Sequence, residues 1–552
     1  MQYSSQSSPG GGQICHAGEK AVEAIEEDQT LYPRGDSPIE RLPVEIFGKP
    51  QNATRLMAIF KWDKKKWALT NCPYALEHII PLLADAPPTN GYTARNADLM
   101  SCLLTSRLFY SVTIAHLYRR IAIIRSDAFT KVLNNISQYP ELRTLVRTID
   151  LSHFTNVGLG RTKRRNSEIQ NLTAETLLNC LELTPRLREF LAQEHLDEEI
   201  SAGVVEKVFC DLPVVECVDF CGSRSLSFRH AFASVLNCDN MSLPPSFTIQ
   251  RLSLHECNTL DSSVFEILLP RLPNLTHLDV CHTQIAESAL VSIPTTARLS
   301  HLNLSKCTRL RGAVVVDFLT THPAVKNTLV YLNLLSDLSR HCLLTQHDVE
   351  KLLTRLPATL RALNLSGAKI TDDHISLLLP LTKHVEELSL GYSELSIDSI
   401  NSIFLPPSLP TDPVKRDGRP LEGAKEWIPP TIHYLDITGV PSITPSNLFD
   451  KSCNLLLPET HPLEVLEMGD KFTQVLKDRK ATNKRVGWAV KEMGRRSWYI
   501  RQAVAEKAQQ GNGGEKQSWK MGALWWGLRK IPVAWGEVGG LCGLYAYYMF
   551  KK

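Results

Sequence analysis

The side chains that most often carry out chemistry in proteins are scattered along this sequence. His341 and His347 flank Cys342, but no further ligand follows at the spacing of a zinc site. The acidic pair Asp372-Asp373 stands where a helix is predicted to begin, and there the carboxylates face the positive end of the helix dipole. We therefore interpret the histidines as solvated loop residues and the acidic pair as part of a helix cap.

The motifs of common enzyme classes are also absent from the sequence. There is no G-x-x-x-x-G-K-[ST] loop, no G-x-G-x-x-G after a strand, no H-E-x-x-H and no G-x-S-x-G. The 14 cysteines form no C-x-x-C pair, and residues 1–18 contain no apolar signal-peptide core. We predict a protein without catalytic residues, metal or cofactor, located inside the cell in the cytoplasm, the nucleus or both.

One pattern is repeated along residues 250–470. An apolar residue, any residue and a second apolar residue are followed by two residues, a small side chain and another apolar residue. Copies of the pattern read RLSLHECNTL, HLDVCHTQI, HLNLSKCTRL and ALNLSGAKI. The first leucine of each copy falls at 252, 278, 302, 332, 363, 388, 435 and 466. Most of these steps lie in or just above the 20–29 residues of a leucine-rich repeat.

Each copy is predicted to form a strand followed by a helix. In L-x-L both leucines point to one side of a strand, and residues 262–272 and 371–381 between strands show helical spacing with capping residues at their start. One unit cannot bury its apolar side alone, so the units must stack. The predicted fold is an α/β leucine-rich-repeat solenoid. Small residues stand at the corner where the chain turns under the next coil: Cys257, Thr283, Cys307, Ala368 and Ser393.

The solenoid is predicted at residues 249–470, with a proline-rich loop inserted at 405–430. Residues 122–248 contain weaker copies of the pattern, and we interpret them as degenerate leucine-rich repeats that extend the solenoid toward the N-terminus. These copies lie at residues 145–154, 187–196 and 215–226.

The chain before the solenoid divides into two parts. Residues 1–38 are rich in Ser, Gly and Glu, which predicts disorder. Residues 39–121 contain two segments with helical spacing, IERLPVEIF at 39–47 and DLMSCLLTSRLFYSVTIAHLYRRI at 98–121. Together these segments resemble the F-box, and with the cysteine-containing repeats behind them the chain resembles a fungal-type F-box/leucine-rich-repeat protein.

This resemblance implies a small all-α F-box-like module that docks on the Skp adaptor of a cullin-type ubiquitin ligase. By resemblance, the adaptor-binding side chains are Leu42, Pro43, Ile46, Ile79 and Ile80 in the docking helix, with Leu103, Ser106 and Phe109 in the second helix. The other interpretation is a helical cap that only covers the first coil of the solenoid.

Residues 48–76 interrupt the resemblance. These 29 residues, with Trp62 and Trp67, differ from their surroundings, and without them the chain reads LPVEIFEHIIPLLA, one amphipathic helix. The codons for Gly48-Lys49 can form a 5′ splice-site sequence, and the codons for Leu76-Glu77 can contain the AG that ends an intron. We interpret the segment as a retained intron; if it is translated, it splits the docking helix.

The concave strand face is predicted to bind a protein substrate, so that the chain would be the substrate-recognition subunit of an SCF-type ligase. The residues expected to be exposed there are mostly small, polar or acidic, which suits a basic or polar protein surface. They are Ser253, His255, Asp279, His282, Asn303, Ser305, Asn333, Asn364, Ser389 and Asp436. The asparagines recur at one register and alternatively form a ladder of structural hydrogen bonds.

Charge is distributed unevenly although the net charge is only +3. Residues 471–552 hold 17 Lys and Arg against 5 Asp and Glu, with six of the nine Trp. Residues 472–509 show a basic helical pattern, and residues 531–550 are mostly apolar. We favour a cap on the solenoid end; peripheral membrane binding, a tail anchor and nucleic-acid binding are the other interpretations. The alternative function is a non-ligase scaffold held at a membrane by this tail.

Overall fold

The computed structural model describes residues 76–81, 92–123, 126–151, 154, 172–236, 243–336, 341–406, 428–493, 496–502, 528–532 and 545–548. The predicted disordered start, nearly all of the 48–76 segment, most of the 405–430 loop and most residues after 502 lie outside this description. Leu42, Pro43 and Ile46 lie outside it as well.

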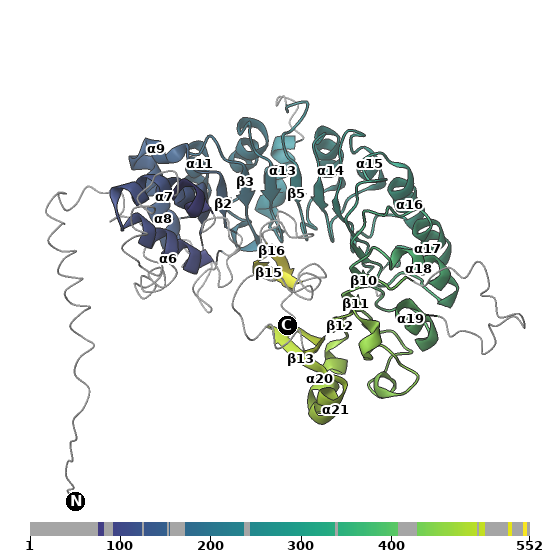
Figure 1. Cartoon of the computed structure of the whole chain (residues 1–552). Coiled ribbons are helices and arrows are strands. Elements are labelled where there is room, and N and C mark those ends of the chain that lie inside the picture. Colours follow the sequence, from purple (N-terminus) through teal and green to yellow (C-terminus); the bar gives the residue numbers. More distant parts are fainter. Residues whose placement is uncertain are drawn as a thin grey trace, which may run out of the picture.

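A single fourteen-stranded sheet runs through the described chain, and its first twelve strands are parallel neighbours in chain order. Short strands follow one another along the inside of an arch, with helices along its outside (Figure 1). The twelve strands are β1 (Arg120–Ala122), β2 (Thr148–Asp150), β3 (Glu189–Leu191), β4 (Cys217–Asp219), β5 (Arg251–Ser253), β6 (His277–Asp279), β7 (His301–Asn303), β8 (Tyr331–Asn333), β9 (Ala362–Asn364), β10 (Glu387–Ser389), β11 (Tyr434–Asp436) and β12 (Val465–Glu467). The leucine-rich-repeat solenoid is therefore confirmed, with a strand at each of the eight predicted copies.

The register of the sheet follows the leucine pattern. Leu252 pairs with Leu278, and Leu278 pairs with Leu302. This alignment is the one that puts every apolar side chain on the same side of the sheet, and a slip by one residue would turn them all to the other side. The weaker copies follow the same rule, because Ile149 pairs with Phe190 in strands that continue the sheet without a break.

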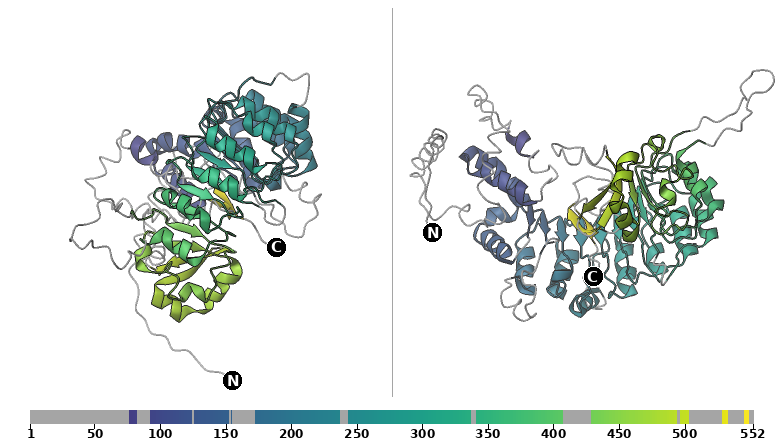
Figure 2. Two further views of the ribbon diagram at one scale, coloured as in Figure 1. Left: turned by 90° about the vertical axis from the view of Figure 1, so that its right-hand side faces the viewer. Right: turned by 90° about the horizontal axis from the view of Figure 1, so that it is seen from below.

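Helices and short helical turns connect the parallel strands on the convex side, as the views from the side and from below also show (Figure 2). The α-helices from the start of the sheet onward are α8 (Ser126–Gln138), α9 (Pro140–Arg143), α11 (Ala174–Glu182), α12 (Ala202–Glu206), α13 (Leu226–Leu236), α14 (Ser262–Leu268), α15 (Glu287–Val291), α16 (Gly312–Thr321), α17 (Gln346–Leu353), α18 (Ile375–Leu381) and α19 (Ile397–Phe404). Shorter 3-10 or π turns are η3 (Glu194–Leu196), η4 (Lys207–Asp211), η5 (Leu269–Arg271), η6 (Asp372–His374), η7 (Asn447–Phe449) and η8 (Pro458–Thr460).

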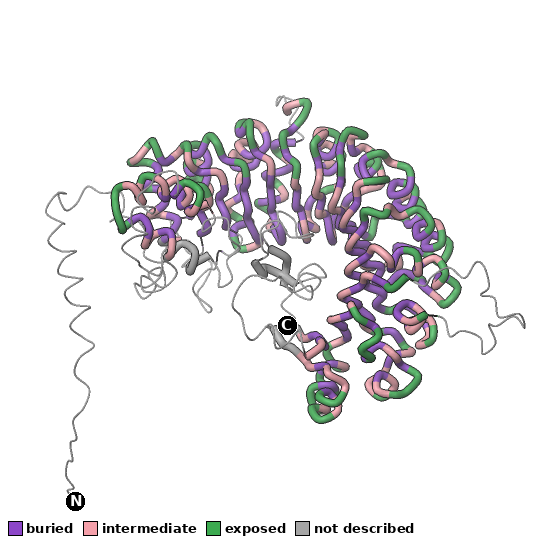
Figure 3. The backbone as a smooth tube through the Cα atoms, in the orientation of Figure 1, coloured by how far each residue is buried: buried purple, intermediate pink, exposed green. Residues whose placement is uncertain are grey.

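The core lies between the strands and the helices, and buried residues follow the strands along the whole arch (Figure 3). In the regular repeats it is built of leucines, such as Leu252 and Leu302, both fully buried. Phenylalanines take this place in the weaker copies, with ring centroids 4.9–6.5 Å apart. They are Phe190, Phe209, Phe220, Phe228, Phe232 and Phe247.

The corner after each strand is tight. All five predicted corner residues are buried, which confirms their role; the Cys307 thiol donates to the Val280 carbonyl of the preceding unit at 3.0 Å. The residue before the corner has a positive φ in seven units. Glycine adopts a positive φ without steric cost. Four units instead have a residue with a side chain that normally avoids this conformation: Glu256, His282, Lys306 and Tyr392.

Helices precede the sheet. Residues 76–81 are helical, and α6 (Tyr92–Leu103) packs against α7 (Arg107–Arg119). Ser106 begins α7 because its hydroxyl accepts a hydrogen bond from the backbone N–H of Phe109 at 3.3 Å. The chain passes from α7 directly into β1, so this helical module is continuous with the solenoid.

The sheet ends in a different way at its C-terminal side. After β12 come α20 (Asp470–Asp478), α21 (Lys480–Val486), β13 (Trp488–Met493) and β14 (Arg496–Arg501), and β14 pairs antiparallel with β12. Trp488, Trp498 and Tyr499 are fully buried. The predicted helix over 472–509 was wrong at Trp488–Met493 and Arg496–Arg501, because these two segments pair with each other as antiparallel strands. Gly487 ends α21 with φ +73.

A separate two-stranded sheet consists of β15 (Leu528–Pro532) and β16 (Tyr545–Tyr548). Among the described residues, no helix has the length and apolar composition needed to cross a bilayer.

Candidate protein-binding site

The residue between the two apolar residues of each strand faces the concave side, and in several units its side chain bonds to its own backbone. In six units its carboxylate or amide oxygen accepts a hydrogen bond from the backbone N–H two residues later, at 2.8–3.1 Å. The six residues are Asp219, Asp279, Asn303, Asn333, Asn364 and Asp436. This bond holds the backbone at the point where the strand ends and the corner begins.

This arrangement corrects the predicted exposure of the concave face. Seven of the ten predicted side chains are buried, with 0–8% exposure: Ser253, Asn303, Ser305, Asn333, Asn364, Ser389 and Asp436. Four of these side chains, the three asparagines and Asp436, accept a hydrogen bond from their own backbone, whereas Ser305 donates to Asn303 and Ser389 donates to Asp436. The recurring asparagines therefore form structural hydrogen bonds within their units. His255, Asp279 and His282 are the predicted residues that stay partly open.

Two of the open residues belong to one polar cluster. The Nδ1 of His255 lies 3.0 Å from the Oδ2 of Asp279, which also accepts a hydrogen bond from the Nδ2 of Asn303 at 3.0 Å. Burial lowers the pKa of His255, but the Asp279 and Cys281 side chains raise it more, so the pKa lies well above its usual value. His255 is thus an imidazolium at neutral pH. His282 follows in the strained corner, with φ +54.

An aromatic column lies beside this cluster, at the position before the first leucine. The His277 and His301 rings stack with centroids 4.0 Å apart, and the Tyr331 ring follows at 5.8 Å. Burial, together with His301 and Arg251, lowers the pKa of His277 to about 2, and burial lowers that of His301 to about 4. Both imidazoles are neutral at physiological pH, so this column of stacked and largely buried rings carries no charge.

A second polar cluster lies at β10–β12. The Ser389 hydroxyl donates to Asp436 at 2.6 Å, and Trp498 of the last strand donates its indole N–H to Glu467 at 3.2 Å. Tyr434 donates its hydroxyl to the same Glu467 carboxylate. These acidic side chains bond to the solenoid itself, which ties the end strands to one another.

The predicted adaptor-binding residues of the helical module differ in how far they are buried. Ile80 and Leu103 are buried in the chain's own core cluster, whereas Ile79 and Phe109 are partly buried and Ser106 is exposed. In this conformation Ile80 and Leu103 stabilise the module rather than form its surface. Sequence reasoning missed Leu104, which is 66% exposed in the turn between α6 and α7. The apolar pair Leu103-Leu104 was the signal, since only one of two adjacent helix-end leucines can face inward.

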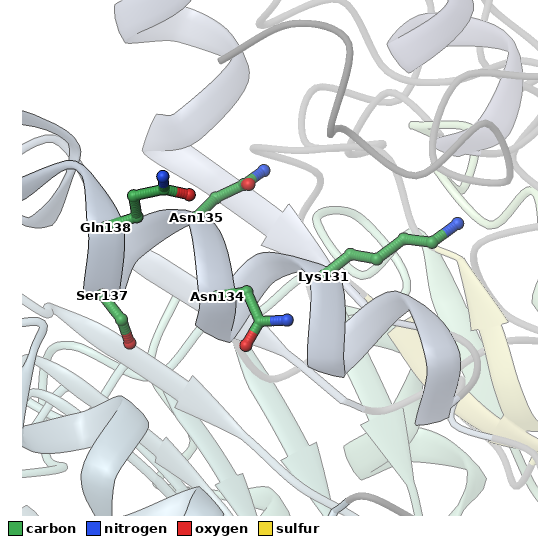
Figure 4. Close-up of a pocket in the computed structure, with 5 residues that line it drawn as sticks. All are labelled: Lys131, Asn134, Asn135, Ser137 and Gln138. Atoms are coloured by element: carbon green, nitrogen blue, oxygen red, sulfur yellow. The ribbon is translucent and has the colours of Figure 1, made fainter. Parts of the chain in front are cut away.

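A cavity of about 640 Å³ lies along α8. Its described lining comes from that helix alone: Lys131, Asn134, Asn135, Ser137 and Gln138 (Figure 4). Asn135 donates to the Tyr118 hydroxyl at 3.3 Å. This lining contains no carboxylate, thiol or imidazole, and no group of three or more metal-binding side chains occurs among the described residues.

Three comparisons relate the chain to known proteins. No protein-family profile matches it. It is 31% identical over 250 residues to the F-box protein YLR352W of Saccharomyces cerevisiae, and the match covers 42% of this chain. The chain spans about a third of the length of that relative, 31%. Among solved structures it is similar to the yeast complex of Rad7 and Elc1, with a TM-score of 0.40 and 14% identity, over 78% of this chain and 100% of the other.

Proposed function

We propose that the chain is the substrate-recognition subunit of an SCF-type cullin ubiquitin ligase. The observation that carries this proposal is the 31% identity to a protein named as an F-box protein. The order of elements supports it, because a helical module precedes a long curved sheet that offers a binding surface. The proposed partners are the Skp adaptor with its cullin core and a protein substrate.

The proposed mechanism is proximity and not covalent chemistry. The helical module would hold the adaptor through Leu42, Pro43 and the half-buried Phe109, with Leu104 as a further apolar contact. The module runs into β1 without a linker, so a substrate on the solenoid is held at a fixed distance from the ubiquitin-charged enzyme. Raising the local concentration of a target lysine is the whole contribution of such a subunit.

The substrate is proposed to bind the concave face at β5–β7. His255, Asp279 and His282 are the partly open predicted residues there, and the neutral His277 and His301 stack lies next to them. This combination of a carboxylate and hydrogen-bonding imidazoles suits a polar or basic peptide segment. The seven buried residues act on binding indirectly, by holding the strand ends.

A pull-down tests the ligase proposal. The full chain and a form without residues 48–76 are each mixed with the Skp adaptor, and the shortened form is expected to retain it. Leu42→Ala with Pro43→Ala should abolish the retention, whereas Lys451→Ala, an exposed change near the other end of the chain, should leave it intact. If neither form retains the adaptor, the ligase proposal is wrong.

A scaffold held at an anionic membrane is the second candidate. It is favoured by the exposed cations of α20 and α21 and by Val475 of α20, an apolar side chain that is 40% exposed. The cations are Lys471, Lys477, Lys480, Lys484 and Arg485. Co-sedimentation with phosphatidylserine vesicles, compared with phosphatidylcholine vesicles, separates the two. Binding that Lys480→Glu with Lys484→Glu removes, without adaptor retention, would favour the scaffold.

A further inference from the structure

The residue just before each strand belongs to a second column along the solenoid, at the edge of the sheet. Backbone hydrogen bonds between neighbouring units connect its members: the Arg147 N–H donates to the Arg119 carbonyl at 2.9 Å, and the Arg188 N–H donates to the Arg147 carbonyl at 2.7 Å. These residues precede β1, β2 and β3, near the N-terminal end of the arch (Figure 1). Adjacent strands lie about 4.8 Å apart, so the column begins with three arginines in succession, one for each strand.

The other end of the same column alternates in charge. Arg361, Glu386, His433 and Glu464 follow one another there, connected by the same kind of backbone bond at 2.7–2.9 Å. The Nε of Arg361 lies 3.7 Å from a carboxylate oxygen of Glu386, and His433 lies 4.0 Å from Glu464. A basic residue is thus placed beside a glutamate of the next unit. The three arginines at the start of the column have no glutamate between them, so positive charge accumulates there.

A fourth arginine adds to this charge. Arg186 is exposed two residues before Arg188, and a guanidinium N–H of Arg147 donates to its carbonyl at 3.4 Å. Burial lowers the pKa of Arg147, and the cations Arg186, Arg188 and Arg119 lower it further, so these guanidinium groups are close enough to repel that of Arg147. We call the four residues Arg119, Arg147, Arg186 and Arg188 the arginine rim.

The charge of the arginine rim is only partly balanced within the chain. Glu216, in the next unit, lies 3.0 Å from Arg188 and is the one carboxylate that pairs with the rim among the described residues. Arg147 is half-buried and donates a hydrogen bond to the Thr144 carbonyl at 2.7 Å, whereas the other three arginines are exposed. Val214, two residues before Glu216, adds an apolar side chain with 38% exposure at the next step of this edge.

We propose that the arginine rim binds a carboxylate-rich segment of a partner protein. The planar guanidinium group matches a carboxylate with two parallel hydrogen bonds, so each bound carboxylate would take the place of the glutamate that this part of the column lacks. Val214 would give the segment an apolar contact. The rim holds four cations over about 10 Å, fewer than the six to ten phosphate contacts of a typical DNA-binding surface, and its next member is acidic, so a peptide is favoured over a nucleic acid.

This surface is separate from the site proposed for the substrate. The rim lies at the edge of the sheet at β1–β3, and the substrate site lies on the concave side at β5–β7. The substrate site suits a polar or basic segment and the rim suits an acidic one, so a protein that carries both would bind in one orientation along the arch. The rim proposal does not depend on the ligase function, since it concerns binding by the chain alone.

Fluorescence anisotropy with the full chain tests the proposal. The probes are a short labelled peptide of alternating glutamate and serine, and the same peptide with glutamine in place of glutamate. Arg119→Gln with Arg186→Gln removes two exposed cations and should weaken binding of the acidic peptide about 10-fold at physiological salt. Arg309→Gln with Arg355→Gln removes the same charge from exposed positions in later units and should change the affinity by less than about 2-fold. Equal weakening by the two double variants would show that net charge alone drives binding, and the proposal would be wrong.

Arginine modification locates the acidic peptide on the wild-type chain, so its result does not depend on how the variants fold. Phenylglyoxal reacts with accessible guanidinium groups, and mass spectrometry reports the reaction at each arginine. The peptide should protect Arg119, Arg186 and Arg188 and leave Arg309 and Arg355 reactive. An unprotected rim overturns the proposal. Protection of the rim by a short single-stranded DNA at a lower concentration than the peptide overturns it as well, because the partner would then be a nucleic acid.

Discussion

The strands in the middle of the arch, β5 to β8, and the strands that end it, β13 and β14, differ in direction, in composition and in what covers them. The middle strands are three residues long, parallel and built on Leu-x-Leu. The end strands have six residues each, are antiparallel and carry Trp488 and Trp498. The leucines of the middle strands are buried, and so are Trp488, Trp498, Tyr499 and Ile500 of the end strands.

The difference follows from what each strand has for a neighbour. A middle strand is covered on both edges by a copy of itself, so small polar residues and stacked imidazoles are buried by repetition. The last repeat has a neighbour of its own kind on one side alone. It is closed by a hairpin whose large aromatic side chains cover more area per residue, and whose β14 satisfies the open backbone groups of β12.

The largest effect is expected from removing an aromatic side chain of the end strands. Trp488 is fully buried, stacks on Tyr499 at 5.4 Å, lies under the Arg501 guanidinium at 4.8 Å and donates to the Leu456 carbonyl at 3.1 Å. Trp488→Ala should lower the free energy of unfolding by about 4 kcal/mol, because it leaves a large cavity. Urea unfolding measures this.

Trp488→Phe is the matched control for that change. It keeps most of the ring and loses the hydrogen bond, so a loss of about 1–2 kcal/mol is expected. Equal effects of the two substitutions would mean that the hairpin is not packed as described, and the contrast with the middle strands would fail.

The next effect concerns the histidine stack of the middle strands and appears with pH. Unfolded histidine takes up a proton near pH 6.5, but folded His301 does so only near pH 4 and folded His277 near pH 2. Between the folded and the unfolded pKa values the unfolded chain binds more protons than the folded chain. The contribution of these histidines to the free energy of unfolding is therefore fully present above pH 6.5 and decreases as the pH falls below it. At pH 5 the expected loss is about 2 kcal/mol for each histidine.

The measurement is the free energy of unfolding at pH 7 and pH 5 for the wild type and for His277→Gln with His301→Gln. The double variant should show a much smaller difference between the two pH values. Since His255 is present in both proteins, its opposite contribution cancels in the comparison. An unchanged pH dependence would show that other groups cause it.

A smaller loss is expected from the backbone-binding asparagines. Asn303→Ala removes the acceptor of the Ser305 N–H bond, 3.1 Å long, and of the Ser305 hydroxyl bond, and should cost about 1–2 kcal/mol. Asn303→Asp keeps the acceptor but puts a second carboxylate 3 Å from Asp279. It should therefore become less destabilising as the pH is lowered through the carboxyl range. If the alanine variant is as stable as the wild type, the structural role is wrong.

The smallest effect is a gain in stability at the corner. Lys306 has φ +56, which costs a non-glycine residue about 1 kcal/mol. Lys306→Gly should raise the free energy of unfolding by up to about 1 kcal/mol. Tyr392→Gly should gain less, because the Tyr392 ring lies against Gly439, where an added Cβ would come within 2.5 Å of it. A loss of stability at Lys306 would contradict strain at this corner.

Periodicity is what made most of the fold predictable. The L-x-L pattern located the strands β5–β12 and the buried corners, and Thr371 begins the predicted helical segment with a capping box. In residues 472–502 the basic helical pattern predicted helix throughout. The strands there form because Tyr499 and Ile500 meet the open edge of β12, a contact between segments about 34 residues apart.

The concave face shows the same limit at the level of side chains. Alternation correctly put Asn303, Asn333 and Asn364 on the side away from the leucines, yet it could not say whether they reach solvent. Whether an asparagine reaches solvent depends on the backbone N–H of the residue two positions later. The tight corner turns this N–H toward the side chain, which accepts a hydrogen bond from it. Similarly, only the pairing of β5 with β6 brings His255 to Asp279 and Cys281, residues that no motif connects.

The amino-acid order alone specified a stack of strand–helix units, their spacing and their buried corners, because a repeated apolar pattern has one way to bury itself. Three features depended on the folded chain: which polar side chains stay open, which helix-end leucine of the module is exposed, and how the last strand is covered. Each of these is set by contacts between segments far apart in the chain, where local pattern carries no information about the neighbour.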